Sequence, residues 1–143
     1  MPNHAIVLGL DRYATDLSGL DGPVADAQAF ASWLLSSGEI AATDLHLGLL
    51  PGDSSPSDPP LLAACQRIGT TLSDIDRLLV GLYRAPPADI GRLYFFFSGH
   101  GAASSNPAYA EEAICLQGFA EDAWMNALEL SSLLGMLNGV PAD

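Results

Sequence analysis

The amino-acid sequence predicts a three-layer α/β/α fold, in which helices cover both faces of a mostly parallel β-sheet. Three apolar segments have the length of buried strands, and segments with helical spacing of apolar residues lie between them. The order strand, helix, strand, helix, strand implies right-handed crossovers and hence a parallel sheet. Because three long strands make only a narrow sheet, we expect an incomplete α/β domain that lacks later strands.

The first strand and the first helix are expected near the amino terminus. Residues 5–10 are apolar and form the first strand. Pro23 suits the first position of a helix, with Asp21 or Gly22 as the residue that caps it. Apolar residues then recur at helical spacing until Gly38, which is expected to end the helix.

A second strand and a long loop follow. Residues 45–50 form the second expected strand, and His46 within it is expected to lie at the surface or on the pleat rather than to bind a ligand. Residues 51–60 contain four prolines and are expected to form a surface loop. A short helical segment is expected within residues 61–68.

The remaining elements alternate in the same way. Ser73 is the expected N-cap of a helix over residues 74–84, whose apolar residues form one stripe. The third strand, residues 93–97, is expected to be buried on both faces. After a polar loop, residues 113–116 are expected to form a short strand in a hairpin, and residues 130–137 a last helical segment.

The composition limits the classes of function. With 49% hydrophobic and 15% charged residues the chain is expected to fold, and its net charge of −12 argues against nucleic-acid or anionic-membrane partners. A basic partner or substrate is compatible with this charge, as is simple solubility. No apolar run approaches the ~18 residues of a membrane span and no signal sequence is evident, so we expect a soluble cytoplasmic protein.

The two cysteines, Cys65 and Cys115, are too few for a disulfide framework. Neither has a second cysteine or a histidine at the spacing of metal ligands. Both are therefore expected to be small buried apolar residues, and the sequence predicts no metal site and no cofactor.

A histidine between two glycines follows the third strand. Residues 93–97 lead without a polar break into Ser98, Gly99, His100 and Gly101. Open α/β sheets place ligands and chemistry at the carboxyl ends of their strands, and glycines let the backbone turn sharply and a substrate approach closely. From the residues alone, His100 is either a catalytic residue or part of a turn that ends the strand.

Three features of the sequence together resemble one family. The first strand ends near Gly9 and Tyr13, residues 20–27 open the first helix, and residues 94–101 form a strand that leads into Ser-Gly-His-Gly. This arrangement resembles the caspase-like cysteine peptidases (peptidase C14), in particular the bacterial relatives of caspases and metacaspases. The resemblance implies that residues 1–143 are the amino-terminal part of a single caspase-like (p20-type) catalytic domain.

The resemblance also implies an activity and its residues. A caspase-like endopeptidase uses a Cys–His dyad, in which a thiolate attacks the scissile carbonyl and the histidine holds and delivers the proton. His100 matches the catalytic histidine, and the backbone N–H of Gly101 matches one donor of the oxyanion hole. Ser98 and Asp26 match positions that line the primary specificity pocket of metacaspases. The implied partner is a polypeptide substrate.

The sequence departs from the family in its specificity pocket. Leu20 stands where caspases that cut after aspartate carry an arginine, and Pro23 and Ala25 stand where metacaspases carry cysteine and asparagine. Asp26 and the negative net charge favour a basic residue before the scissile bond. A cap or staple of the first helix is the alternative role for Asp26.

The nucleophile is the larger departure. It should follow the histidine by roughly 50 residues, whereas 43 residues follow His100. Cys115 is the sole cysteine among them, and its apolar surroundings in the sequence favour a core residue. We therefore expect a chain that stops before the nucleophile and is inactive without the missing carboxyl-terminal part of the same domain. The alternatives are a non-catalytic pseudo-protease that acts through protein binding and, ranked last, a nucleophilic Cys115.

Overall fold

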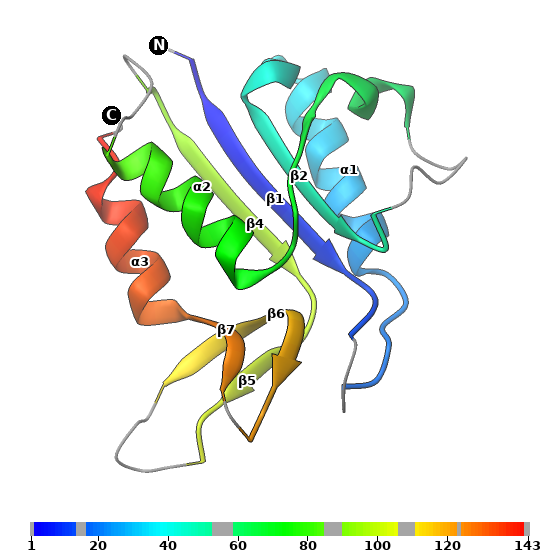
Figure 1. Ribbon diagram of the computed structural model, residues 1–143. Coiled ribbons are helices and arrows are strands. Elements are labelled where there is room, and N and C mark those ends of the chain that lie inside the picture. Colours follow the sequence, from blue (N-terminus) through cyan, green and yellow to red (C-terminus); the bar gives the residue numbers. More distant parts are fainter. Residues whose placement is uncertain are drawn as a thin grey trace.

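Two β-sheets and three α-helices make up the described part of the chain, which a computed structural model gives as residues 2–13, 17–52, 59–84, 90–105, 111–122 and 124–141. The strands are β1 (His4–Leu10), β2 (Leu45–Leu50), β3 (Gln66–Arg67), β4 (Leu93–Ser98), β5 (Gly101–Ala103), β6 (Glu112–Ala120) and β7 (Met125–Glu129). The helices are α1 (Pro23–Ser36), α2 (Leu72–Arg84) and α3 (Leu130–Gly139). Figure 1 shows the smaller sheet, β5 to β7, beyond the carboxyl ends of β1 and β4.

The larger sheet is parallel throughout, with the strand order β3-β2-β1-β4. β1 pairs with β2 on one side and with β4 on the other, and all seven of its residues are buried. A strand covered on both faces accounts for the unbroken apolar sequence of residues 5–10. The predicted α/β fold with a mostly parallel sheet is confirmed.

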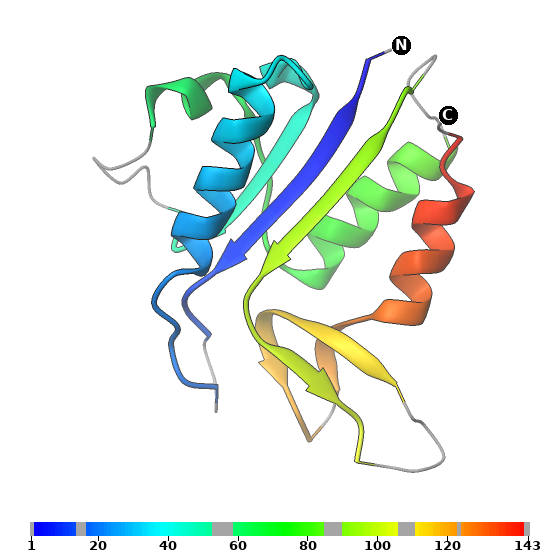
Figure 2. The same cartoon turned by 180° about the vertical axis from the view of Figure 1, so that it is seen from behind.

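Helices cover both faces of this sheet. α1 lies on one face, and α2 and α3 lie side by side on the other (Figures 1 and 2). Successive side chains of β1 point to opposite faces of the sheet. Val7 packs in the cluster that includes α1, and Leu8 packs in the cluster that includes α2 and α3. Gly9 lies against the carbonyl oxygen of Pro23 at the start of α1, so a side chain there would collide with the helix.

β4 is confirmed as a strand, and its side chains pack against the clusters on both faces of the sheet, but they are not fully buried as expected. Among the described residues β4 pairs with β1 alone, and each of its six residues is partly exposed. The reason is its position at the edge of the sheet, where no second neighbour covers it. Phe96 still contributes to the α1 layer, because its ring stacks on Phe30 with the centroids 4.5 Å apart.

The start of α1 agrees with the sequence, and its cap comes from a more distant residue. α1 begins at Pro23, and Gly22 before it has a φ of 140°, in the range that favours glycine. The side chain that satisfies the first turn belongs to Asp11, whose Oδ1 accepts the Val24 N–H at 2.9 Å. Gly22 therefore occupies the capping position, and the alternative, Asp21, does not.

The predicted cap of α2 is wrong by two residues. α2 begins at Leu72, one residue after Thr71. Thr71 Oγ1 accepts the Asp74 N–H at 3.2 Å, and the Asp74 carboxylate accepts the Thr71 N–H at 3.3 Å. This reciprocal pair is a capping box, in which two backbone donors at the start of α2 find side-chain acceptors.

The carboxyl-terminal elements extend the predictions. The strand expected at residues 113–116 lies in the first half of β6, which pairs antiparallel with both β5 and β7. α3 follows β7 directly, and Glu111 Oε1 accepts the Ser131 N–H in its first turn at 3.3 Å. Within the described ranges, no helix combines the length and the apolar character needed to cross a membrane.

Candidate active site

His100 lies at the carboxyl edge of the larger sheet, between the end of β4 and the start of β5. The segment that follows β1 folds against it, because Tyr13 and Ser18 both form hydrogen bonds with His100. Two stretches of chain more than eighty residues apart thus meet at this edge. It is the position where open α/β sheets place their ligands.

One hydrogen bond fixes the imidazole of His100. Its Nε2 lies 2.8 Å from the main-chain carbonyl oxygen of Ser18. A carbonyl oxygen can only accept, so the neutral ring carries its proton on Nε2, and Nδ1 is its basic atom. The side chain is partly exposed. The contact therefore orients a histidine that can take up a proton at Nδ1 and release it again.

Tyr13 holds the backbone of His100. The main-chain N–H of His100 donates to the Tyr13 hydroxyl oxygen at 2.8 Å, and the two rings meet edge to face with their centroids 5.0 Å apart. Burial raises the pKa of the Tyr13 hydroxyl, which keeps it protonated and neutral. The position of the imidazole thus depends on both Tyr13 and Ser18.

Gly99 is required by this packing. A Cβ at Gly99 would lie 2.5 Å from the Tyr13 hydroxyl and 2.6 Å from the ring of Phe97. The sequence predicts glycine here for a sharp turn. The structure gives a second reason, the close approach of Tyr13 to the bend before His100.

Two further residues predicted for the site, Ser98 and Asp26, are brought together. Ser98 ends β4, Asp26 lies in the first turn of α1, and the Ser98 hydroxyl donates to Asp26 Oδ2 at 3.1 Å. The Asp26 carboxylate thus faces the end of β4, while the cap of α1 comes from Asp11. Asp26 is exposed and Ser98 partly exposed, so a ligand could reach the pair.

Gly101 begins β5 and is exposed. The backbone next to it is anchored, because the carbonyl oxygen of His100 accepts the N–H of Cys115 at 3.0 Å. β6 therefore supports the His100–Gly101 peptide from behind. The role of the Gly101 N–H as an oxyanion-hole donor stays a prediction.

The Cys115 thiol has the character of a core group. Cys115 is 0% exposed and packs with Phe119 and Ala127 on one side of β6. Burial raises the pKa of the Cys115 thiol, and it does the same for Cys65 in the α1 layer. A nucleophilic cysteine has a lowered pKa and an accessible sulfur. The prediction that both cysteines are small buried residues is confirmed.

His46 lies at the opposite end of the larger sheet, on β2, and is partly buried. Burial, with a smaller contribution from His4, lowers its pKa.

In the described parts of the chain, no group of three or more His, Cys, Asp or Glu side chains is arranged to hold a metal ion.

Ser18 and the role of Tyr13 are the site features that the sequence did not reveal. Ser18 contributes a main-chain carbonyl, which any residue could supply, so no residue pattern signals it. Tyr13 is part of the family resemblance, but only the fold shows that its hydroxyl bonds to the backbone of His100.

Comparison with known proteins gives one distant similarity. No protein-family model matches the chain. Over 135 residues, 93% of its length, the chain is 29% identical to a probable protease from a Desulfuromonadales bacterium, and the aligned part spans 16% of that protein. The chain is therefore similar to a small part of a much longer probable protease.

Proposed function

We propose that this chain is the histidine-bearing part of a caspase-like cysteine endopeptidase domain. The observation that carries the proposal is the imidazole of His100, held at Nε2 by the Ser18 carbonyl and basic at Nδ1, at the carboxyl edge of a parallel sheet. The similarity to a probable protease supports the same class of reaction.

The proposed chemistry needs a thiol from outside the described residues. A cysteine on a strand that pairs with the open edge of β4 transfers its proton to His100 Nδ1, and its thiolate attacks the scissile carbonyl carbon. The oxyanion that forms accepts a hydrogen bond from the Gly101 N–H. His100 then returns the proton to the leaving amine, and it activates the water that hydrolyses the thioester.

The specificity that we propose is for a basic residue before the scissile bond. The Asp26 carboxylate accepts a hydrogen bond from the hydroxyl of Ser98, which stands two residues before His100. Leu20 supplies no positive charge that would bind an acidic residue. An arginine or lysine side chain could pair with Asp26.

The test compares the complete gene product, including any residues encoded after residue 143, with residues 1–143 alone. Fluorogenic peptides that end in arginine, lysine or aspartate are the substrates. We expect the complete product to cleave after arginine or lysine, and residues 1–143 alone to cleave none of them. His100→Ala should lower kcat/KM by about 10²–10⁴-fold, and circular dichroism checks that the variant folds.

Two results would contradict this proposal. A complete product that cleaves no peptide contradicts the endopeptidase, and cleavage after aspartate alone contradicts the assignment of Asp26. Unchanged activity in His100→Ala would remove the histidine from the mechanism.

A non-catalytic module that acts through protein binding is the second candidate. The observation that favours it is the burial of both cysteines, which leaves the described chain without an accessible thiol. A gene product that ends at residue 143, unfolds cooperatively and is inert toward all the peptides would favour this candidate. A nucleophilic Cys115 ranks last, and full activity in Cys115→Ala would exclude it.

A further inference from the structure

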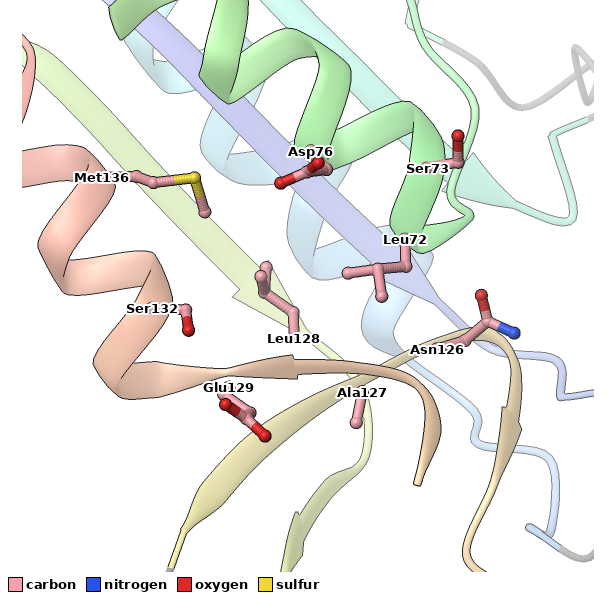
Figure 3. A pocket seen from close by; sticks show the side chains of 9 residues that line it. All are labelled: Leu72, Ser73, Asp76, Asn126, Ala127, Leu128, Glu129, Ser132 and Met136. Carbon is pink, nitrogen blue, oxygen red and sulfur yellow. The ribbon is translucent and has the colours of Figure 1, made fainter. Parts of the chain in front are cut away.

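A groove of about 560 Å³ lies between α2, α3 and β7, and His100 is not among the residues that line it. It is lined by the first turns of α2, by residues 126–129 of β7 and by one side of α3 (Figure 3). Its apolar lining includes Leu72, Leu128 and Met136. Nothing in the proposed endopeptidase mechanism uses this groove.

The groove follows the edge of a strand. Successive side chains of a regular strand point to opposite faces, so three consecutive residues can line one groove only if the groove runs along the strand's edge. Residues 127–129, the part of β7 that pairs regularly with β6, line it, next to Asn126, whose φ of 53° is not that of an extended strand. β6 occupies the other edge of β7, because the order of the small sheet is β5-β6-β7. The groove therefore lies along the outer edge of β7.

The charges of the groove have one sign. Asp76 on α2 and Glu129 at the end of β7 both line it, and Figure 3 shows them on opposite sides of Leu128. Among the described residues that line the groove, none is basic. With a net charge of −12, a second copy of the chain would be repelled from this surface.

We propose that this groove is a docking site for an extended, basic segment of another polypeptide, which adds a strand to the edge of β7. Backbone hydrogen bonds to the strand edge give such a complex its affinity, and side-chain pockets give it specificity. Apolar side chains of the segment lie against Leu72 and Met136, which are partly exposed. Its arginine or lysine side chains pair with Asp76 and Glu129. The regularly paired part of β7 is residues 127–129, so a short extended segment fits this edge.

Fluorescence anisotropy with three labelled peptides tests the proposal. The first is a six-residue peptide in which arginine and leucine alternate, the second has glutamate in place of arginine, and the third is the first with methylated backbone amides. We expect the arginine peptide to bind, the glutamate peptide not to bind, and the methylated peptide to bind at least about fivefold more weakly, since each lost hydrogen bond costs about 1 kcal/mol.

Variants of the chain locate the binding. Asp76→Asn and Glu129→Gln should each lower the affinity for the arginine peptide by about two- to fivefold, as expected for partly exposed ion pairs. Asp122→Asn removes the same charge from an exposed turn outside the groove and should leave the affinity unchanged. Backbone amide shifts of residues 126–129 should move on titration.

Several outcomes would overturn the proposal. Equal binding of the glutamate peptide excludes charge recognition, and unchanged binding of the methylated peptide excludes strand addition. Equal losses in all three variants show a general charge effect. Shifts confined to the surroundings of His100 place the peptide in the proposed active site instead, and the same shifts on concentrating the chain alone assign the groove to a second copy.

Discussion

Tyr13 is the residue on which the geometry of His100 most depends. Its hydroxyl accepts the His100 N–H, and its ring packs against the imidazole. We predict that Tyr13→Phe keeps the ring contact but loses the hydrogen bond, at a cost of about 1 kcal/mol in unfolding free energy. Amide exchange measured by NMR should be faster at His100.

The matched control is Tyr83→Phe, because Tyr83 is 54% exposed and lies on α2, away from the site. It should change neither the exchange at His100 nor the stability. Unchanged exchange at His100 in Tyr13→Phe would show that the hydroxyl does not hold this backbone.

Two glycines give opposite predictions for the same substitution. Gly99→Ala places a Cβ against Tyr13 and Phe97 and should destabilise the protein by about 1–3 kcal/mol, as overpacking does. Gly81→Ala, within α2 and with nothing within 4 Å of its Cβ, should stabilise it by about 0.5–1 kcal/mol. Urea unfolding of the two variants measures both effects. A Gly99→Ala variant that is as stable as Gly81→Ala would contradict the close packing of Tyr13 and Phe97 around Gly99.

His46 should make stability depend on pH. Burial lowers its pKa in the folded state below the ordinary value of 6.5, so the unfolded state binds more protons as the pH falls through this range. We predict that the unfolding free energy decreases from about pH 7.5 to about pH 5.5. His46→Gln should show a smaller decrease over the same range. An equal decrease in the variant would assign the effect to other groups.

At the scale of the elements, the start of α2 shows where local sequence misleads. Ser73 is a good N-cap by residue type, yet Thr71 and Asp74 form the capping box. Serine and threonine are both favoured N-cap residues, so residue type does not decide between Ser73 and Thr71. The position of the cap depends instead on where the chain enters the helix after β3. The cap of α1 is similar, since Asp11 reaches it from the end of β1, a contact that only the fold brings about.

The corrected cap gives a direct test. Thr71→Ala removes the side-chain acceptor of the Asp74 N–H, which also donates to the Thr71 main-chain carbonyl, and should cost about 1 kcal/mol of unfolding free energy. Ser73→Ala should cost little, because Ser73 is an exposed residue within the first turn. Thermal or urea unfolding of the two variants compares them, and a larger loss in Ser73→Ala would restore the original prediction.

Elements with strong apolar patterns were predictable, and the position of each within the sheet was not. The sequences of β1 and β4 are both continuous apolar runs, which predict a buried strand in each case. β1 is central and wholly buried, whereas β4 is at the edge. The strand order depends on how the connections between strands cross the sheet. The sequences of β1 and β4 themselves do not encode that arrangement. For the candidate site, the sequence did not reveal that Ser98 and Asp26 form a hydrogen bond with each other, because the contact joins β4 to α1; their role toward a substrate stays a prediction.

At the scale of the whole molecule, the exposed edge of β4 favours association between copies of the chain, and the net charge disfavours it. The edge carries aromatic residues and, from Leu93 to Ser98, no charged residue or proline, which are the features that normally prevent pairing between edges. The charge of −12 keeps separate copies apart over distances set by the ionic strength.

We therefore predict that residues 1–143 alone associate as the salt concentration rises. The Debye length falls from about 10 Å at 0.1 M to about 3 Å at 1 M, so repulsion no longer offsets pairing of the β4 edges. Sedimentation velocity at several protein concentrations should show a monomer at low salt and larger species at high salt. The β4 amides should become protected from exchange in the associated form. A monomer under all conditions, or protection elsewhere, would show that the β4 edge is not the surface through which copies pair, and that it does not by itself demand a partner strand.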